Sequence, residues 1–333
     1  MEEHRGARLI TIVGTPRNGA SVLAGALHEL GADLGVEPPS LPSAADDPGA
    51  LFEHLPVLNL NRDLLIALGG TWSTPPALPP GWVDDERISY LRLRADLVAS
   101  QTPERMIVKD SRLSLVQPLW EDVGSVCATI LCLRNPIAVA ELLSAQYSLT
   151  VSQSLFLWFR YNASAFLVRP DALVVEYESL LENSVIELTR IADHIDLDVD
   201  SGLIEAAART MPPLTHDRGE TDPRDTPIEV MCKRLHDLMR SGERLDSDET
   251  VWLWARLATE LPWAGPGDPD IRRARREVVE LSTQVLRLTR DERRTSRRLR
   301  RLEADLQQAL RAADDATLNQ TMDLLAALEI SRP

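Results

Sequence analysis

The residues from Gly14 to Ser21 follow the pattern G-x-x-x-x-G-x-S, between an apolar run and a stretch of helical composition. In such a turn the backbone N–H groups and the start of the helix can hold an anion. Nucleotide triphosphatases need a lysine directly after the second glycine, where this chain has Ala20, so an ordinary ATPase or kinase is disfavoured. The cation of the turn is Arg17, which binds oxyanions in a fork and stays charged at any pH. The pattern predicts an oxyanion site, and a strand-to-helix turn without a ligand is the alternative.

Three more charged side chains, Lys109, Asp110 and Arg112, follow a predicted strand at Met106–Val108. Ligands of α/β proteins bind at the carboxyl ends of parallel strands, so these groups are candidates for one shared site. For Lys109 and Asp110 a structural ion pair is the alternative.

A sheet is needed to bring these side chains together, and the sequence predicts one. β-Branched apolar runs that end at turn residues alternate with stretches of helical composition. Strands are expected at Arg8–Gly14, Met106–Val108, Ala128–Leu133 and Ala172–Glu176, and helices at Val22–Leu30, from Pro136 onward, at Leu180–Ile195 and at Leu203–Arg209. This alternation predicts an α/β fold with a parallel sheet and helices on both faces.

The charge is divided unevenly along the 333 residues. The net charge is −15, but residues 271–301 contain 12 arginines and 4 acids, which leaves −23 for the remainder. An acidic body argues against the binding of nucleic acid. Prolines and glycines after Leu261 predict a linker, so we expect an α/β domain at 1–265, followed at 266–333 by a linker and an arginine-rich helical extension.

The extension has the apolar spacing of a coiled coil. Residues of the seam recur at alternating spacings of 4 and 3 between Leu281 and Leu306, with two polar interruptions. A lone amphipathic helix leaves its apolar stripe in water, so the seam predicts a partner. Arginines would repel one another in a parallel pair, and the alternatives are an antiparallel dimer or docking on an acidic surface. We expect a homo-oligomer formed through this helix.

The sequence also bears on where the protein resides. No apolar run approaches the ~20 residues that cross a bilayer, and the apolar run at 9–13 is too short for a signal peptide. Three cysteines, Cys127, Cys132 and Cys232, form neither a metal-binding spacing nor a paired set. We expect Cys127 and Cys132 to be core thiols, and the protein to be cytoplasmic without a transmembrane segment.

Four further segments accompany the loop in a fixed order between Leu9 and Leu197. They are Leu51-Phe52-Glu53-His54 with Asn61, Val108-Lys109-Asp110-Ser111-Arg112-Leu113 with Leu119-Trp120, Leu133-Arg134-Asn135-Pro136 with Val139-Ala140, and Leu157-Trp158 and Tyr161 with Val174-Val175-Glu176-Tyr177-Glu178-Ser179-Leu180-Leu181. Together with the loop they resemble the bacterial branch of the sulfotransferases that use 3′-phosphoadenosine 5′-phosphosulfate (PAPS).

This resemblance implies a P-loop-like fold and the transfer of a sulfuryl group from PAPS to a hydroxyl or amine of a small molecule or glycan, with no metal. The implied PAPS-binding residues are Thr15, Pro16, Arg17, Asn18, Gly19, Ala20, Ser21, Arg134 and Arg218. In the implied catalytic set, Arg17 stabilises the leaving phosphate and is joined by Lys109. Glu53 or His54 takes the acceptor proton, with Glu53 the first choice. A solvated loop charge is the alternative for Glu53.

The chain departs from the family pattern at three positions. Asn18 and Ala20 stand where the family usually has serine and threonine, and Leu142 replaces a serine of the 3′-phosphate site. Ser144 lies two residues on, and at about 100° per residue it faces away from the position of Leu142. The changes at Ala20 and Leu142 keep one alternative open, a sulfotransferase-fold protein with altered or lost catalysis. A nucleotide kinase or ATPase is a separate alternative, which the missing lysine opposes.

Overall fold

The computed structural model describes residues 9–35, 52–76, 78, 81–102, 105–123, 126–213 and 226–242. The chain divides into two units, Met1–Val279 and Glu280–Pro333, and every described residue belongs to the first. Arg218, the predicted domain boundary near residue 265 and the arginine-rich extension lie outside the described residues. They stay predictions.

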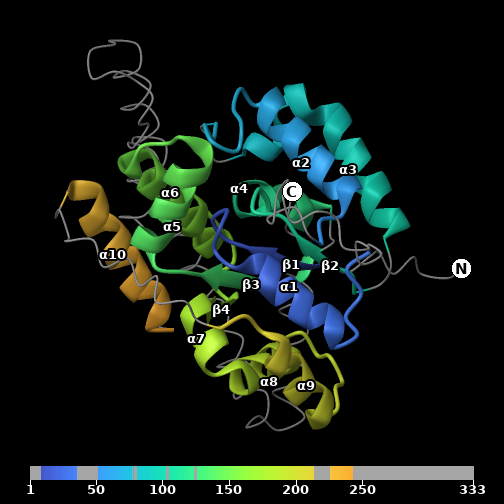
Figure 1. The fold of residues 1–333 in the computed structure, drawn as a ribbon. Helices are drawn as coiled ribbons and strands as arrows, with labels where there is room; N and C mark the ends of the chain where they lie inside the picture. The colour runs from blue at the N-terminus through green and yellow to red at the C-terminus, as the bar shows by residue number, and fades with distance from the viewer. Residues whose placement is uncertain are drawn as a thin grey trace, which may run out of the picture. The chain divides into compact units, whose positions relative to one another are not determined.

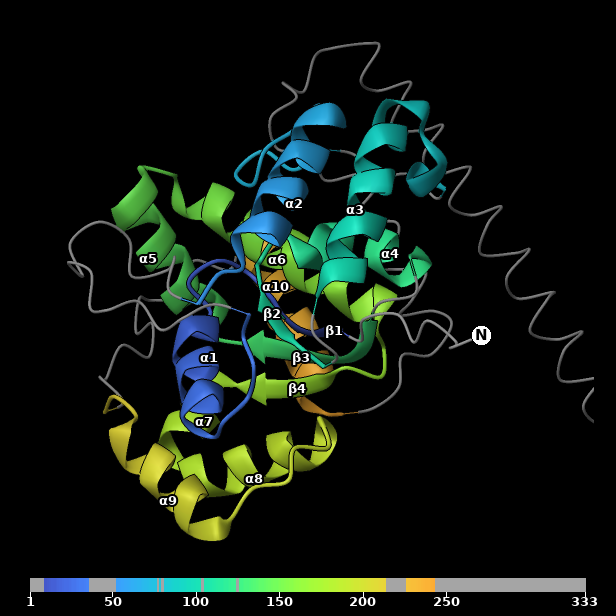
Figure 2. The same ribbon diagram turned by 90° about the vertical axis from the view of Figure 1, so that its right-hand side faces the viewer.

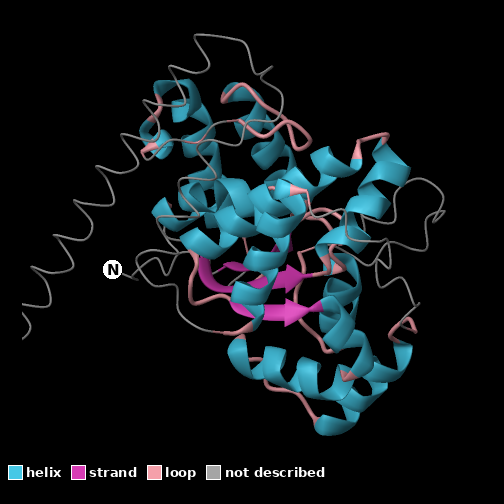
Figure 3. Ribbon diagram, turned by 90° about the vertical axis from the view of Figure 1, so that its left-hand side faces the viewer, coloured by secondary structure: helices cyan, strands magenta, loops and turns pink. Residues whose placement is uncertain are grey.

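The core of the fold is a parallel sheet (Figure 3). Its strands are β1 (Leu9–Val13), β2 (Ile107–Lys109), β3 (Val126–Leu133) and β4 (Leu173–Glu176), in the spatial order β2-β1-β3-β4. All three pairings are parallel. The carboxyl ends of the strands therefore meet at one edge, and the expected α/β class is confirmed.

Helices cover both faces of this sheet (Figures 1 and 2). The helices are α1 (Ala20–Glu29), α2 (Leu55–Ala67), α3 (Ser89–Gln101), α4 (Leu113–Asp122), α5 (Pro136–Tyr147), α6 (Val151–Val168), α7 (Tyr177–Glu182), α8 (Ser184–His194), α9 (Ser201–Thr210) and α10 (Pro227–Arg240), with short 3₁₀ turns at Trp82–Asp84 and Glu86–Ile88. In the figures, α8 and α9 lie on the opposite side of the sheet from α2 and α3.

Strand β1 shows why the sheet needs cover on both faces. Side chains alternate along a strand, so Leu9 and Val13 pack into the core that α2 to α6 and α10 close, whereas Ile10 and Ile12 pack into a second core with α1, α8 and α9. All four side chains are buried. A continuous apolar strand of this kind is typical of a parallel sheet buried on both sides.

Most predicted elements are confirmed, with local differences. Pro136 is the first residue of α5, and Asn135 caps it by accepting from two backbone N–H groups. The single helix expected at Leu180–Ile195 is two helices, α7 and α8, separated at Asn183. Within the described residues, no helix is long and apolar enough to cross a membrane.

Candidate functional site

The loop between β1 and α1 has a backbone that glycine makes possible. Gly14 and Gly19 have φ angles of 127° and 93°, and Arg17, at the apex, is also left-handed with a φ of 71°. A Cβ on Gly19 would lie 2.1 Å from Cδ2 of Tyr177. Left-handed backbone is costly for a residue with a side chain. The loop therefore holds Arg17 at its apex in a strained backbone conformation.

Asn18 holds the loop from inside. Its Nδ2 donates to the carbonyl oxygen of Cys132 at 2.7 Å and to that of Val13 at 3.3 Å, and its Oδ1 accepts from the backbone N–H of Ala20 at 3.0 Å. The side chain is buried and bridges the ends of β1 and β3 to the start of α1. Asn18 is therefore placed to support the loop, and its amide is occupied within the protein.

Thr15 and Gly14 tie the loop to the helices behind it. The buried Thr15 hydroxyl accepts from Nδ2 of Asn162 at 2.8 Å, and the backbone N–H of Gly14 donates to Oγ of Ser114 at 2.7 Å. By contrast, the backbone N–H groups of Arg17 and Gly19 make no hydrogen bond to any described residue. The loop thus turns its hydroxyl and amide side chains inward and leaves backbone donors and Arg17 for a ligand.

Arg134 lies beside Arg17 at the end of β3. Its Nη1 donates to the carbonyl oxygen of Arg17 at 3.4 Å, and its guanidinium carbon lies 4.5 Å from the ring centre of Tyr177. The Nε atoms of both arginines are buried and have no hydrogen-bond partner among the described residues. Buried guanidinium donors are costly to leave unpaired, so this pair of cations suits an anion with several oxygen atoms.

Lys109, at the end of β2, reaches the same loop from the neighbouring strand. Its side chain is only 4% exposed, and its Nζ lies 3.2 Å from Oε1 of Glu53 and 3.1 Å from Oγ of Ser21. Ser21 is in the first turn of α1. The predicted site residues Lys109, Glu53 and Ser21 are therefore in contact, and the ion pair of Lys109 is with Glu53 rather than with Asp110.

The environment of Glu53 sets its proton affinity. Burial raises the pKa of the Glu53 carboxyl above its ordinary value, and the positive charge of Lys109 acts in the opposite direction. A carboxylate with a raised pKa is a stronger base once it is ionised. Its neighbour His54 precedes α2, and the His54 ring approaches Gly35. Burial lowers the pKa of His54, against the opposing charge of Asp33.

Asp110 belongs to a buried polar network that joins α2, β2 and α4. Its Oδ2 accepts from Nδ2 of Asn61 at 2.9 Å, and Oδ1 of Asn61 accepts from Nε1 of Trp120 at 2.9 Å. Its Oδ1 accepts from the backbone N–H of Arg112 at 3.0 Å. Because α2 follows Glu53 and β2 ends at Lys109, this network fixes the two elements that carry the ion pair.

The remaining predicted positions fall in different places. Leu142 is half-buried on α5, and the Ser144 hydroxyl lies 3.4 Å from that of Ser154 on α6. Pro16 and Ala20 are half-buried in the loop. Cys132 is buried, and Cys127 is half-buried against the second core.

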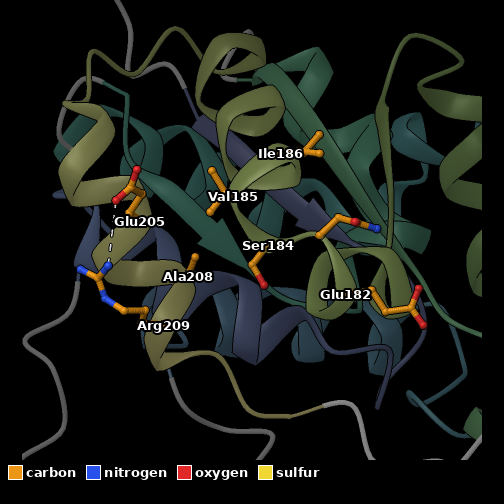
Figure 4. A pocket seen from close by; sticks show the side chains of 8 residues that line it. Glu182, Ser184, Val185, Ile186, Glu205, Ala208 and Arg209 are labelled. Atoms are coloured by element: carbon orange, nitrogen blue, oxygen red, sulfur yellow. Dashed lines mark ion pairs between the residues drawn. The ribbon is translucent and has the colours of Figure 1, made fainter.

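A shallow hollow of about 460 Å³ lies between α8 and α9 (Figure 4). Its lining residues are Glu182, Asn183, Ser184, Val185, Ile186, Glu205, Ala208 and Arg209. It contains none of the residues predicted for the site, and its polar groups include the exposed pair of Arg209 and Glu205, 4.0 Å apart. Among the described residues no group of His, Cys, Asp and Glu side chains could hold a metal ion.

The sequence did not predict the residues that support the loop from behind. Asn162 and Ser114 hold the loop through hydrogen bonds, although neither lies near it in the sequence. The Arg134–Tyr177 contact joins two segments that the resemblance had named separately. The pairing of the strands explains this contact. Strands β3 and β4 are parallel neighbours, so the residues that directly follow them, Arg134 and Tyr177, lie side by side.

No protein-family model and no curated protein matches this chain. Among solved structures it is similar to the sulfotransferase domain of the Synechococcus PCC 7002 olefin synthase, with 18% identity over 79% of this chain and 98% of that one, and a TM-score of 0.39. It is similar to sulfotransferase STF9 from Mycobacterium avium, with 14% identity over 72% of this chain and 78% of that one, and a TM-score of 0.42. A third likeness is to retinol dehydratase in complex with androsterone and the inactive cofactor PAP, with 14% identity over 78% and 83% and a TM-score of 0.35.

Proposed function

We propose that this protein is a PAPS-dependent sulfotransferase that acts on a hydroxyl or amine of a small molecule or glycan. The observation that carries the proposal is the pair of guanidinium groups of Arg17 and Arg134, whose buried Nε atoms have no hydrogen-bond partner among the described residues. They lie at a loop whose backbone N–H groups at Arg17 and Gly19 make no hydrogen bond to any described residue. A nucleotide with phosphate groups at the 3′- and 5′-positions of its ribose presents oxyanions to two such cations. The segments that resemble the sulfotransferase family support the same substrate.

In the proposed reaction the acceptor oxygen forms a bond to sulfur while the bond between sulfur and the 5′-phosphate oxygen breaks. The electron pair of that bond leaves with the phosphate as 3′-phosphoadenosine 5′-phosphate (PAP). Negative charge grows on this leaving oxygen, as in phosphoryl transfer, and a positioned cation there lowers the barrier. Arg17 is the residue assigned to that charge, and the loop N–H groups assist it.

The acceptor hydroxyl must lose its proton in the same reaction. Glu53 is assigned as the base because its carboxylate contacts Lys109, which contacts the loop. The Lys109 ammonium lies 3.1 Å from Oγ of Ser21 in the first turn of α1, and from there it can stabilise the oxygens of the sulfuryl group during transfer. His54 is the weaker candidate for the base, since its ring approaches Gly35 and no described contact joins it to Lys109.

One observation favours the second candidate, a sulfotransferase-fold protein with altered or lost catalysis. Oδ1 of Asn18 accepts from the backbone N–H of Ala20, which is one of the first donors of α1. That donor is then unavailable to a phosphate, and Ala20 offers no hydroxyl in its place. PAP binding without turnover of PAPS is the expected behaviour of this alternative.

The test is release of PAP from PAPS in the presence of a panel of hydroxylated and amino compounds. The proposal predicts acceptor-dependent release by the wild type and none by Arg17→Gln. Arg62→Gln is the matched control, because Arg62 is an exposed arginine that pairs with Asp63 on α2. Turnover retained by Arg17→Gln contradicts the role of Arg17, and the absence of turnover with every acceptor favours the alternative.

A further inference from the structure

Arg112 is a third arginine at the carboxyl edge of the sheet, and neither the loop nor the proposed nucleotide contacts account for it. It follows β2 and precedes α4, and its side chain is 20% exposed. Its buried Nε has no hydrogen-bond partner, and the guanidinium donates to none of the described residues. Arg112 thus shares with Arg17 and Arg134 a buried Nε that has no hydrogen-bond partner among the described residues, at the end of a different strand.

The carboxylate nearest to Arg112 is already engaged elsewhere. Oδ1 of Asp110 lies 3.3 Å from Nε of Arg112 and balances its charge without accepting a hydrogen bond from it. Both oxygens of Asp110 accept from other donors, namely Nδ2 of Asn61 and the backbone N–H of Arg112 itself. The two terminal nitrogens of the guanidinium therefore have no acceptor in the described part of the chain.

The electrostatic neighbours of the three arginines separate them into two places. Arg17 and Arg134 act on the pKa of Tyr177, at the end of β4. Arg112 acts instead on the pKa of Glu53 and on that of the buried Tyr161. The contacts agree, because Nε of Arg112 lies 3.3 Å from Oδ1 of Asp110, and the adjacent residue Lys109 has its Nζ 3.2 Å from Oε1 of Glu53. Arg112 therefore lies on the side of Glu53, the proposed base, where the acceptor must bring its hydroxyl.

From this arrangement we infer that the acceptor carries an oxyanion, a carboxylate or an ester of sulfate or phosphate, and that Arg112 binds it. A guanidinium with two free terminal nitrogens matches such a planar or tetrahedral oxyanion through two parallel hydrogen bonds. This inference rests on the proposed function, because it places the acceptor beside Glu53. It adds the chemical class of the acceptor.

The test uses matched pairs of hydroxylated probes that differ in one group. The pairs are para-hydroxyphenylacetate with para-hydroxyphenylacetamide, and hydroxybutyrate with hydroxybutyramide. Binding is followed by ligand-observed NMR on the full chain, with and without saturating PAP. In at least one pair the carboxylate is expected to bind the wild type roughly tenfold more tightly than the amide, the scale of hydrogen bonds to a charged group.

Variants assign that preference to Arg112. Arg112→Gln is expected to abolish the preference and Arg112→Lys to retain part of it, because lysine keeps the charge but not the fork. Arg62→Gln is the control at an exposed arginine, and PAP affinity and the melting temperature of each variant are measured alongside. Equal binding of acid and amide, binding of neither, or a preference that survives Arg112→Gln overturns the inference. Loss of PAP binding in the wild type would instead count against the proposed function.

Discussion

Arg17 and Asn18 are neighbours in one loop, and the structure predicts opposite consequences when each is replaced by alanine. Asn18→Ala removes two buried hydrogen bonds, to Cys132 and Val13 at 2.7 and 3.3 Å, and a partly buried one with Ala20 at 3.0 Å. At about 1 kcal/mol for each, with less for the longest, the free energy of unfolding is expected to fall by about 2–3 kcal/mol. Arg17→Ala removes a guanidinium whose Nε has no partner, so stability is expected to stay within about 0.5 kcal/mol.

The two variants are compared by urea unfolding and by calorimetric titration with PAP. Arg17→Ala is expected to lose PAP binding and sulfuryl transfer while it unfolds at the wild-type urea concentration. Asn18→Ala is expected to unfold at a lower concentration, and Arg62→Ala serves as the control for a surface arginine. The reasoning is refuted if Asn18→Ala is as stable as the wild type, or if Arg17→Ala binds PAP with unchanged affinity.

Three other predictions follow from the same contacts. Lys109→Met removes the positive charge that lowers the pKa of Glu53, so this pKa is expected to rise further. The acid limb of the pH profile of kcat/KM then moves to higher pH, and an unmoved limb would exclude Glu53 as the base. Leu142→Ser is expected to tighten PAP binding by about 1 kcal/mol, and unchanged calorimetric affinity would place Leu142 away from the nucleotide. Burial lowers the pKa of His236 to about 4 from 6.5, so the unfolded chain binds more protons than the folded one in this interval, and stability present above pH 6.5 is lost on acidification. His236→Gln is expected to remove about 2 kcal/mol of the stability lost between pH 7 and pH 5, as measured by urea unfolding at those two pH values, and an identical pH dependence would contradict it.

The His236 prediction depends on the balance of charges around the ring. Nε2 of His236 lies 3.8 Å from Oε1 of Glu176, a contact that would favour the charged ring. Nε of Arg240 lies 2.5 Å from the same oxygen and neutralises it, so burial and the Arg240 charge prevail. The ring is therefore expected to be neutral at pH 7.

The sequence predicted the elements whose patterns are local. Each strand is a short β-branched run that ends at a turn, and the starts of α1 and α5 carry a glycine loop and an Asn-Pro cap. Helix α6 was not predicted, because it is buried along most of its length and has no polar face to reveal a helical period. Helix α4 was not predicted either, since it contains Pro118, which normally argues against a helix interior.

The candidate site was predictable as a set of residues and not as a set of contacts. Its loop and its cations follow predicted strands, and a parallel sheet must bring such positions to one edge. The partner of Lys109 was not predictable, because Glu53 is far away in the sequence and the adjacent Asp110 is the more obvious partner. The inward turn of Asn18 depends on a carbonyl of β3, which only the folded sheet places beside the loop.

The central claim is that Arg17 and Arg134 form a site for a nucleotide with phosphates at the 3′- and 5′-positions of the ribose. Calorimetric titration of the wild-type protein with PAP and with adenosine 5′-monophosphate, which lacks the 3′-phosphate, tests it directly. The account predicts that PAP binds at least roughly tenfold more tightly, the scale of hydrogen bonds from a guanidinium to an added phosphate. Equal affinity for the two nucleotides, or no binding of PAP, would contradict it.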